Sequence, residues 1–152
     1  MSSQQKITTY RLESAQSDSA QILRRWCDYF SSPPLNLAFP EVVAAQMVHE
    51  TDFLSSKIYR ENHNMFGMKF SPKKKKQLGD AYPALGEKNG HAYYESPIQS
   101  IKDYRAYQNR ILFYAAKQNR YPHTNEEYMA LLRDLPQFGC GKGVCYAEDP
   151  LY

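Results

Sequence analysis

Apolar residues recur at helical spacing in several stretches of the chain, and breaker residues separate these stretches. Residues 19–31 carry apolar side chains on one helical face, and a Ser-Ser-Pro-Pro run ends the pattern. A second helix is predicted from Pro40 through Glu50, because the missing amide of proline costs nothing at the first helical position. Residues 55–60 fit a third, short helix. This part of the chain is therefore predicted to be mostly helical.

The following part combines a loop-like stretch with two further helices. Residues 71–92 lack helical periodicity and contain an Asn-Gly turn signal, which predicts a loop and a short β-hairpin. Residues 96–99 form a capping box with proline at the first helical position, which predicts a helix ending near Asn119. A second capping box at residues 124–127 predicts a helix through Leu135. Together these elements predict a mainly helical α+β fold.

Composition and charge narrow the function classes. A chain of 152 residues fits one domain, predicted over residues 18–152 after a polar N-terminal arm at residues 1–17. A formal net charge of +3 is mild, so no nucleic-acid partner is expected. No apolar run approaches membrane-spanning length, so no membrane insertion is expected, and the polar N-terminus predicts no Sec signal. The 13 tyrosines suit a groove that stacks on sugars or bases.

The cysteines and histidines do not form a metal-binding pattern. Cys140 and Cys145 flank a tight Gly-rich loop and could close a small ring if oxidised, and the sequence leaves that bridge open. Cys27 lies within a helical pattern and is predicted to be a buried thiol. One C-x4-C pair without clustered histidine is weak evidence for zinc, and the four histidines have no regular ligand spacing. No metal and no cofactor are predicted.

Glu50 is the candidate for acid chemistry. It continues the i, i+4, i+7 line of Val43 and Met47, and a carboxylate on an apolar helical stripe is partly desolvated. Desolvation raises a carboxyl pKa toward a value useful for proton donation. Gln46 lies one turn earlier on nearly the same face and is a candidate substrate-binding residue. The alternative is that Glu50 points to solvent at the helix end, or pairs with a basic residue of the next helix.

The sequence around Glu50 resembles that of the glucosaminidase family of cell-wall hydrolases. This family includes bacterial autolysins, flagellar rod-associated hydrolases and phage lysins. The family pattern is a glutamate after an Ala-Gln helix, a Ser-Lys helix and an Asn-Asn-x-Phe-Gly-x-Lys segment. Later parts of the chain resemble the family's Tyr-x-Ser…Glu-Ser-Ile-x-Asp-Tyr stretch and its Tyr-Ala-Thr-Asp-Pro-x-Tyr motif. The matching segments cover much of residues 40–152 and occur in the family's order: 45–51, 55–59, 62–69, 90–104 and 146–152.

The resemblance implies a lysozyme-like fold in which Glu50 donates a proton to the glycosidic oxygen between N-acetylglucosamine and N-acetylmuramic acid. Asn64 and Phe66 would line the cleft beside it, although Phe66 could instead pack in the core. Tyr146 would be the active-site tyrosine that orients a water molecule or the 2-acetamido group. Tyr94 would stack on a sugar or fill the gap between the hairpin and the following helix. The implied activity is that of an endo-β-N-acetylglucosaminidase.

The second catalytic group is less clear from the sequence. Glycosidases generally use two carboxylates, and many family members place a second glutamate in the β-hairpin. Glu87 is the candidate here, with Asp80 the only other carboxylate near that position. A glutamate in a turn is also commonly solvated, in which case the acetamido oxygen of the substrate would attack instead. The lysine run at residues 73–76 is predicted to be a solvated loop, or a feature that attracts anionic wall polymers.

Three function classes follow from these patterns. The leading one is a peptidoglycan hydrolase that acts on glycan strands in the bacterial cell wall as a monomer. A muramidase or lytic transglycosylase on the same fold would cut the other glycosidic bond. A wall-binding or virion structural module would bind without turnover. Without a Sec signal, the expected routes to the wall are phage lysis as an endolysin, attachment to a virion, or export by a secretion machinery.

Overall fold

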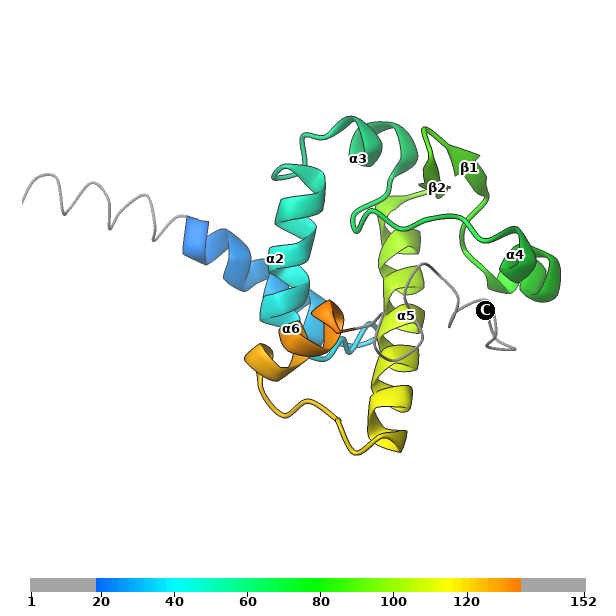
Figure 1. The fold of residues 1–152 in the computed structure, drawn as a ribbon. Coiled ribbons are helices and arrows are strands. Elements are labelled where there is room, and N and C mark those ends of the chain that lie inside the picture. Colours follow the sequence, from blue (N-terminus) through cyan, green and yellow to red (C-terminus); the bar gives the residue numbers. More distant parts are fainter. Residues whose placement is uncertain (1–18, 135–152) are drawn as a thin grey trace, which may run out of the picture.

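The computed structural model describes residues 19–134, drawn as the coloured ribbon in Figure 1. The predicted arm at residues 1–17 lies outside this part of the chain, and so do Cys140, Cys145 and Tyr146. The first helix of the described part covers residues 19–31. The remaining elements are α2 (Pro40–Thr51), α3 (Lys57–Asn62), α4 (Pro72–Leu78), a 3-10 turn η1 (Gly79–Ala81), β1 (Gly86–Lys88), β2 (His91–Tyr93), α5 (Pro97–Lys117) and α6 (Asn125–Arg133). The predicted mainly helical α+β class with a short hairpin is confirmed.

The helix ends follow from their capping residues. Thr124 accepts a hydrogen bond from the backbone N–H of Glu127 at 3.1 Å, so the predicted start of α6 is confirmed. The Glu127 carboxylate accepts from the N–H of His123 at 2.7 Å instead of returning to Thr124. At the start of α5, Ser96 makes no side-chain capping bond, so the predicted capping box is wrong there although the helix begins at Pro97 as expected. Proline at the first position is sufficient to mark that boundary.

The lysine run forms a helix, which corrects the loop predicted for this region. Ser71 caps α4 by accepting from the N–H of Lys74 at 3.1 Å, and Pro72 occupies the first helical position. Lys74 is only 3% exposed, and its ammonium lies 3.2 Å from a carboxylate oxygen of Asp103 on α5. The prediction of a uniformly solvated lysine run is therefore wrong. Four consecutive lysines form no apolar stripe, so periodicity could not show which of them faces inward.

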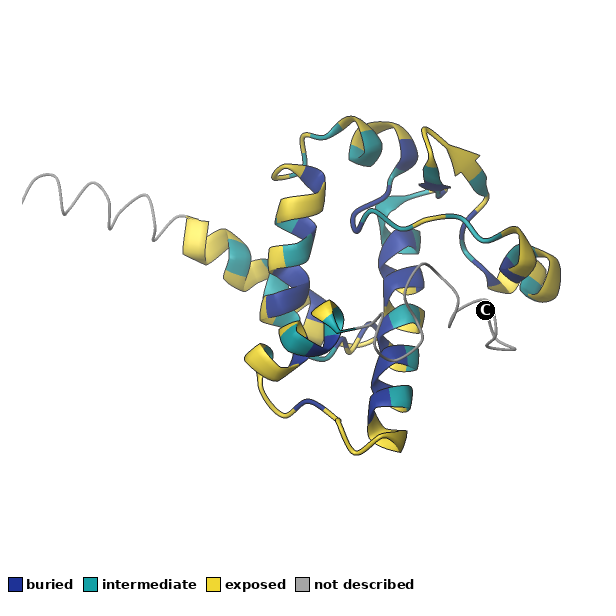
Figure 2. Ribbon diagram, viewed as in Figure 1, coloured by how far each residue is buried: buried dark blue, intermediate teal, exposed yellow. Residues whose placement is uncertain are grey.

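The interior consists of three groups of buried side chains, and α5 contributes to two of them. The first group joins the helix at 19–31, α2, α5 and the segment before α4, and it includes Met47, Phe66 and Tyr104. The second group joins α2, α5 and α6 and includes Tyr128. The third lies beneath the hairpin and contains Tyr82, Ala84, Ala92 and Tyr94. Figure 2 shows the buried residues of α5 as a dark blue band along the helix.

The hairpin is a short antiparallel pair in which Glu87 lies opposite Ala92. Two strands of three residues are not stable alone in water, so the hairpin depends on what it packs against. Helix α3 contacts β2 directly, and Figure 1 shows α3 and the hairpin together at one end of the molecule, beyond α2 and α5. That end therefore brings the C-terminal end of α2 near the hairpin. No helix within residues 19–134 has both the length and the apolar character needed to cross a bilayer.

Candidate active site

The C-terminal end of α2 is a tight turn organised by Thr51. This residue is fully buried, and its hydroxyl donates to the carbonyl of Met47 at 2.6 Å and accepts from the N–H of Leu54 at 2.8 Å. Its carbonyl accepts from two further backbone N–H groups, each at 2.8 Å. Asp52, Phe53 and Leu54 all adopt left-handed conformations, with φ of 48°, 56° and 66°. Non-glycine residues rarely adopt this region, so a strained turn fixes the backbone directly after Glu50.

Glu50 lies over Gly67, in the middle of the Asn-Phe-Gly segment. A β-carbon added to Gly67 would lie 2.6 Å from Glu50 Oε2 and 3.1 Å from its carboxyl carbon. Gly67 also has a φ of +66°, a conformation that glycine adopts without strain. The loop can therefore pass directly beneath the carboxylate only because residue 67 has no side chain.

The environment of Glu50 differs from the prediction in one respect. The side chain is exposed rather than desolvated, because the residue facing it is a glycine and covers nothing. The basic residues of the next helix are engaged elsewhere: Lys57 pairs with Glu61 at 3.9 Å, and Arg60 donates to the carbonyl of Ser55 at 3.0 Å. Within residues 19–134, no ion pair or hydrogen bond involves the Glu50 carboxylate. It is therefore available to a ligand.

Asn64 shapes the loop that passes beneath Glu50. Its amide nitrogen donates to the carbonyls of Met68 and Ala92, both at 2.9 Å. Its amide oxygen accepts from the N–H groups of Phe66 and Met68, at 3.2 and 3.1 Å. All of its usual hydrogen-bonding positions are thus used, and the side chain is 1% exposed. Asn64 was predicted to bind substrate; the structure instead gives it the role of fixing the loop.

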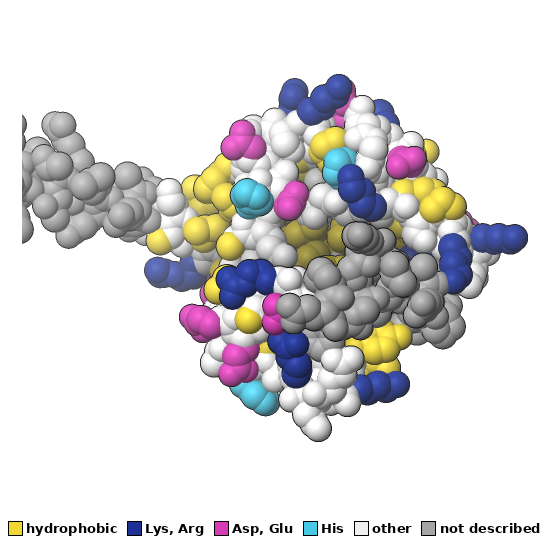
Figure 3. Space-filling model, viewed as in Figure 1, with side chains coloured by type: hydrophobic (Ala, Val, Ile, Leu, Met, Phe, Trp, Pro, Cys, Tyr) yellow, Lys and Arg dark blue, Asp and Glu magenta, His cyan; other side chains and the backbone are white. Residues whose placement is uncertain are grey.

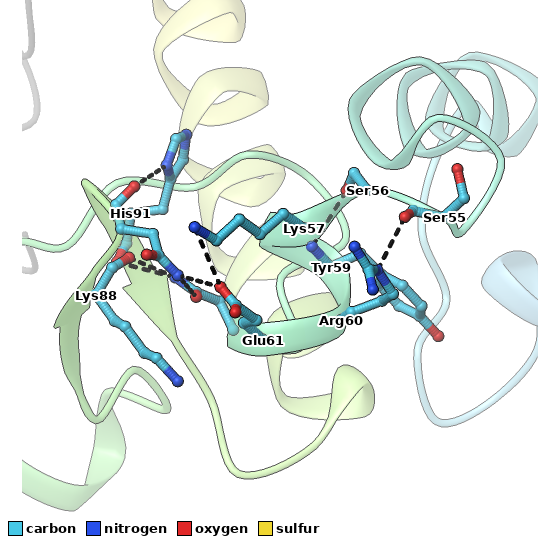
Figure 4. A network of polar contacts seen from close by, with 10 residues as sticks. Ser55, Ser56, Lys57, Tyr59, Arg60, Glu61, Lys88 and His91 are labelled. Carbon is cyan, nitrogen blue, oxygen red and sulfur yellow. Dashed lines mark hydrogen bonds and ion pairs between the residues drawn. The ribbon is translucent and has the colours of Figure 1, made fainter.

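A second polar network holds the hairpin against α3, and Figure 4 shows it from close by. The buried amide nitrogen of Asn62 donates to the carbonyls of Lys88 and Ala92, at 2.6 and 3.2 Å. Asn89, at the hairpin turn, donates to Glu61 Oε2 at 2.8 Å and to Asn62 Oδ1 at 3.1 Å. The hairpin is therefore positioned by the same asparagine-rich segment that passes beneath Glu50.

Phe66 and Gln46 meet at Tyr104 of α5. The Phe66 ring packs against the Tyr104 ring with centroids 4.3 Å apart, and Phe66 is 8% exposed. Phe66 therefore packs in the core, which was the alternative to its predicted place in the cleft. The Tyr104 hydroxyl donates a hydrogen bond to the amide oxygen of Gln46, which remains half-buried at the surface of α2. Gln46 is thus linked to the loop through Tyr104 and Phe66, and Glu50 lies over the next loop residue, Gly67.

The two remaining predicted site residues of the described part lie in and after the hairpin. Tyr94 is 2% exposed, and its hydroxyl donates to Asp103 Oδ2 at 2.5 Å, so it fills the gap between hairpin and α5 and presents no face to a sugar. Glu87 is exposed on β1, and no hydrogen bond or ion pair within residues 19–134 holds its side chain. Tyr146, the predicted active-site tyrosine, lies outside the described residues.

The face of the molecule seen in Figure 3 combines apolar and charged side chains. Figure 3 shows hydrophobic side chains gathered in a hollow at the middle of the face, with acidic, basic and histidine side chains around it. Within residues 19–134, no group of three or more His, Cys, Asp or Glu side chains is arranged to hold a metal ion. Among the described residues of the site, Glu50 offers a carboxyl group that can transfer a proton, and Gln46 offers an amide that can form hydrogen bonds.

Sequence reasoning missed the residues that act from beneath this site. Tyr104, Gln108 and Asp103 all project from α5 into the interior, where Gln108 and Asp103 are 1% exposed. Buried polar side chains on an otherwise apolar helical face were the available signal, because such groups need partners. Gln46, the partner of Tyr104, is 58 residues away in α2, and Lys74, a partner of Asp103, is 29 residues away in α4. No local pattern identifies these partners.

Comparison with known proteins gives one match. A family model described as "Glucosaminidase: Mannosyl-glycoprotein endo-beta-N-acetylglucosaminidase" matches residues 36–152. The matched region begins just before α2 and includes the Glu50 turn, the asparagine-rich loop, the hairpin and α5. No curated protein and no solved structure matches the chain.

Proposed function

Because the chain belongs to the glucosaminidase family of peptidoglycan hydrolases, with its lysozyme-like fold, we propose that it is an endo-β-N-acetylglucosaminidase with Glu50 as general acid. The bond cleaved is the β-1,4 bond from N-acetylglucosamine to N-acetylmuramic acid, and the partner is the glycan strand of the bacterial cell wall. The observation that carries the proposal is the Glu50 carboxylate, which has no partner among residues 19–134 and lies directly over Gly67 of the family's Asn-x-Phe-Gly segment.

The exposure of Glu50 leaves its carboxyl group open to the substrate. Nothing within the described residues covers it, so a bound sugar would lie directly against it. The carboxyl group then donates its proton to the glycosidic oxygen as the bond to the anomeric carbon breaks. The contact with Gly67 and the turn after Thr51 hold it in place for this transfer.

Two groups are proposed for the opposite face of the sugar. The acetamido oxygen of the substrate attacks the anomeric carbon, with Tyr146 orienting it, or Glu87 acts as the second carboxylate. Glu87 lies on a short strand, and none of the residues 19–134 bonds to its exposed side chain, so we favour the substrate-assisted route, which does not need it. Both routes use the same general acid.

Digestion of purified peptidoglycan followed by mass analysis of borohydride-reduced products tests the proposal. A glucosaminidase leaves N-acetylglucosamine at the new reducing end, and the Glu50→Gln protein serves as the blank. N-acetylmuramic acid at the reducing end would show a muramidase, and a 1,6-anhydro ring would show a lytic transglycosylase. Binding to sacculi without any released fragment would contradict an enzymatic role and support a wall-binding module.

The description of the matching family suggests a second substrate for this test. It names mannosyl-glycoprotein as the substrate class, so the same preparation should be offered a high-mannose glycoprotein. We expect fragments from peptidoglycan and none from the glycoprotein. Release of glycans from the glycoprotein alone would overturn the cell-wall assignment while leaving the glucosaminidase chemistry in place.

A further inference from the structure

Gln108 begins a directed chain of hydrogen bonds that leads to the candidate site. Its amide oxygen accepts from the backbone N–H of Ala38 at 2.8 Å, and its amide nitrogen donates to the carbonyl of the same residue at 2.7 Å. A backbone N–H can only donate and a carbonyl can only accept. The pair of bonds to Ala38 therefore fixes which end of the Gln108 amide is nitrogen.

The chain continues through two buried phenols. The Gln108 amide nitrogen donates its other hydrogen to the Tyr128 hydroxyl at 3.1 Å, and the Tyr128 and Tyr104 hydroxyls are 3.0 Å apart. Tyr128 is fully buried, and this burial raises its pKa, so it remains a phenol that carries a proton. It accepts from Gln108 and donates to Tyr104. Tyr104 in turn donates to the amide oxygen of Gln46.

The direction of these hydrogen bonds determines the orientation of the Gln46 amide. With its oxygen turned inward to Tyr104, its nitrogen is directed away from that bond, and no described residue accepts a hydrogen bond from it. Turning the amide round would break the hydrogen bond that the Tyr104 O–H donates to the Gln46 oxygen. Losing that bond is costly in a buried environment.

Gln46 stands next to the candidate acid. It lies one helical turn before Glu50, and its partner Tyr104 packs on Phe66 while Glu50 contacts Gly67. The site therefore presents a carboxyl group and, one turn away, an amide N–H pair with a fixed orientation. A fixed donor selects for a group that can only accept, such as a carbonyl, over a hydroxyl, which can also donate.

We propose that the chain from Ala38 through Gln108, Tyr128 and Tyr104 holds Gln46 as a hydrogen-bond donor to a 2-acetamido carbonyl of the bound glycan beside Glu50, on the leaving-group side of the cleaved bond. This is not the acetamido group that attacks the anomeric carbon from the opposite face. Tyr104 is then a positioning residue, and Gln46 determines specificity for N-acetylated sugars. This inference rests on the proposed function, because it takes the bound ligand to be an amino-sugar glycan.

The test measures binding of two β-1,4-linked tetrasaccharides to the Glu50→Gln protein, in which cleavage is blocked. One is built of N-acetylglucosamine and the other of glucose, so they differ only in carrying an acetamido group or a hydroxyl at C2. We expect tighter binding of the acetylated ligand. Gln46→Glu, which offers acceptors while preserving the acceptor for Tyr104, should remove about three- to tenfold of that preference.

Tyr104→Phe tests the positioning role separately. It leaves Gln46 in place but frees its amide to rotate, so the preference for the acetylated ligand should fall although the contacting residue is unchanged. Tyr59→Phe, at a half-buried tyrosine on α3, is the matched control and should retain the full preference. A thermal unfolding curve for each variant separates loss of fold from loss of recognition. If Tyr104→Phe does not fold, the Gln46→Glu comparison still decides the question.

Equal weakening of both ligands by these variants would overturn the inference, because a merely structural role does not discriminate at C2. The absence of any preference in the Glu50→Gln parent would overturn it as well. Failure of the proposed function is recognised independently, since it appears as wild-type protein that releases no fragments from peptidoglycan. A preference that depends on Gln46 in a protein without turnover would support the donor and refute only the enzyme.

Discussion

The two carboxylates considered for catalysis, Glu50 and Glu87, lie in regions with different local structure. Glu50 lies in the last turn of a twelve-residue helix, faces a glycine close to its carboxylate, and is followed by a turn that the buried Thr51 fixes. Glu87 belongs to a three-residue strand, and its side chain is exposed without a described partner. The hairpin that carries it is held through backbone carbonyls by Asn62 and Asn64. One region fixes a side chain, and the other fixes only a backbone.

This difference bears on what each group can do. Catalytic groups must stand within a fraction of an ångström of the productive position, which requires neighbours that restrict their rotamers. The backbone at Gly67 lies close to the Glu50 carboxylate and limits its movement toward the loop, although no described residue bonds to that carboxylate. Glu87 has neither a bond nor such a close backbone among the described residues, so a role for it would depend on the substrate or on residues beyond position 134. The contrast leads to four predictions.

The largest expected effect comes from Glu50→Gln. The amide keeps the shape of the carboxyl group but cannot donate a proton, so the rate of glycan cleavage should fall by about 10²- to 10⁴-fold. The measurement is release of reducing ends from purified peptidoglycan, with a urea unfolding curve to show that the fold is retained. Full activity in this variant would remove Glu50 from the mechanism and, with it, the contrast between the two regions.

Gly67→Ala should have the next largest effect. The new β-carbon would come within 2.6 Å of Glu50 Oε2, so the carboxylate must move, and a shift of about 1 Å can cost roughly a hundredfold in rate. The left-handed φ of +66° adds about 1–2 kcal/mol of strain in the free energy of folding. Gly90→Ala, at a hairpin glycine with φ +74° and open space around it, is the matched control. The control should share the strain and keep the activity; equal activity losses would show that backbone strain alone is responsible.

Alkaline pH should weaken the hairpin side through Tyr82, which lies beneath the hairpin. Burial first, and then the charge of Asp103, raise the pKa of Tyr82 to about 12 from its usual value near 10, against the effect of a bond from the Ser71 N–H. The unfolded chain therefore ionises first. The stabilisation is fully present below about pH 10 and is lost between about pH 10 and 12, by up to about 3 kcal/mol at about 1.4 kcal/mol per pKa unit.

The measurement is the free energy of urea unfolding at several values of pH from 9 to 12, for the wild type and for Tyr82→Phe. The phenylalanine variant should lose less stability over this interval, since the buried hydroxyl is absent. Parallel curves for the two proteins would show that Tyr82 ionises equally in the folded and unfolded states.

Glu87→Gln should have the smallest effect. An exposed side chain without a described partner contributes within about 0.5 kcal/mol to stability, and we expect the cleavage rate to change by less than about threefold. A fall of a hundredfold or more would identify Glu87 as the second carboxylate and would exclude the substrate-assisted route. The anomeric configuration of the product, followed by NMR early in the reaction, supplies an independent reading of the mechanism.

Local signals predicted much of the fold. Pro40, Pro97 and Thr124 mark helix starts that the structure has at the same places, because a missing N–H or a capping hydroxyl acts within one turn. At α4 the same local signals were present, Ser71 as a cap and Pro72 at the first helical position, but they were not used to predict a helix. What no local signal predicts is the burial of Lys74, because its partner Asp103 lies 29 residues further along the chain.

The candidate site was predicted less completely than the fold. Glu50 and Gln46 could be identified from their spacing and from the family resemblance, and the structure places both over the predicted loop. The desolvation expected for Glu50 is absent, since helical periodicity cannot show that the facing residue is a glycine. Asn64, Phe66 and Tyr94 resembled ligand-binding residues by type, yet their side chains face the interior, where they fix the loop and the hairpin.

The left-handed turn after α2 has a consequence for anyone who tries to improve the protein's heat resistance. Phe53 and Leu54 each hold a conformation that costs a bulky residue about 1–2 kcal/mol, and glycine would relieve that cost. A screen for thermostable variants would therefore favour glycine at these two positions. Such variants would also loosen the backbone that sets where Glu50 stands. Selection for stability alone would therefore lower the rate of glycan cleavage. A useful screen must measure thermal stability and cleavage activity together.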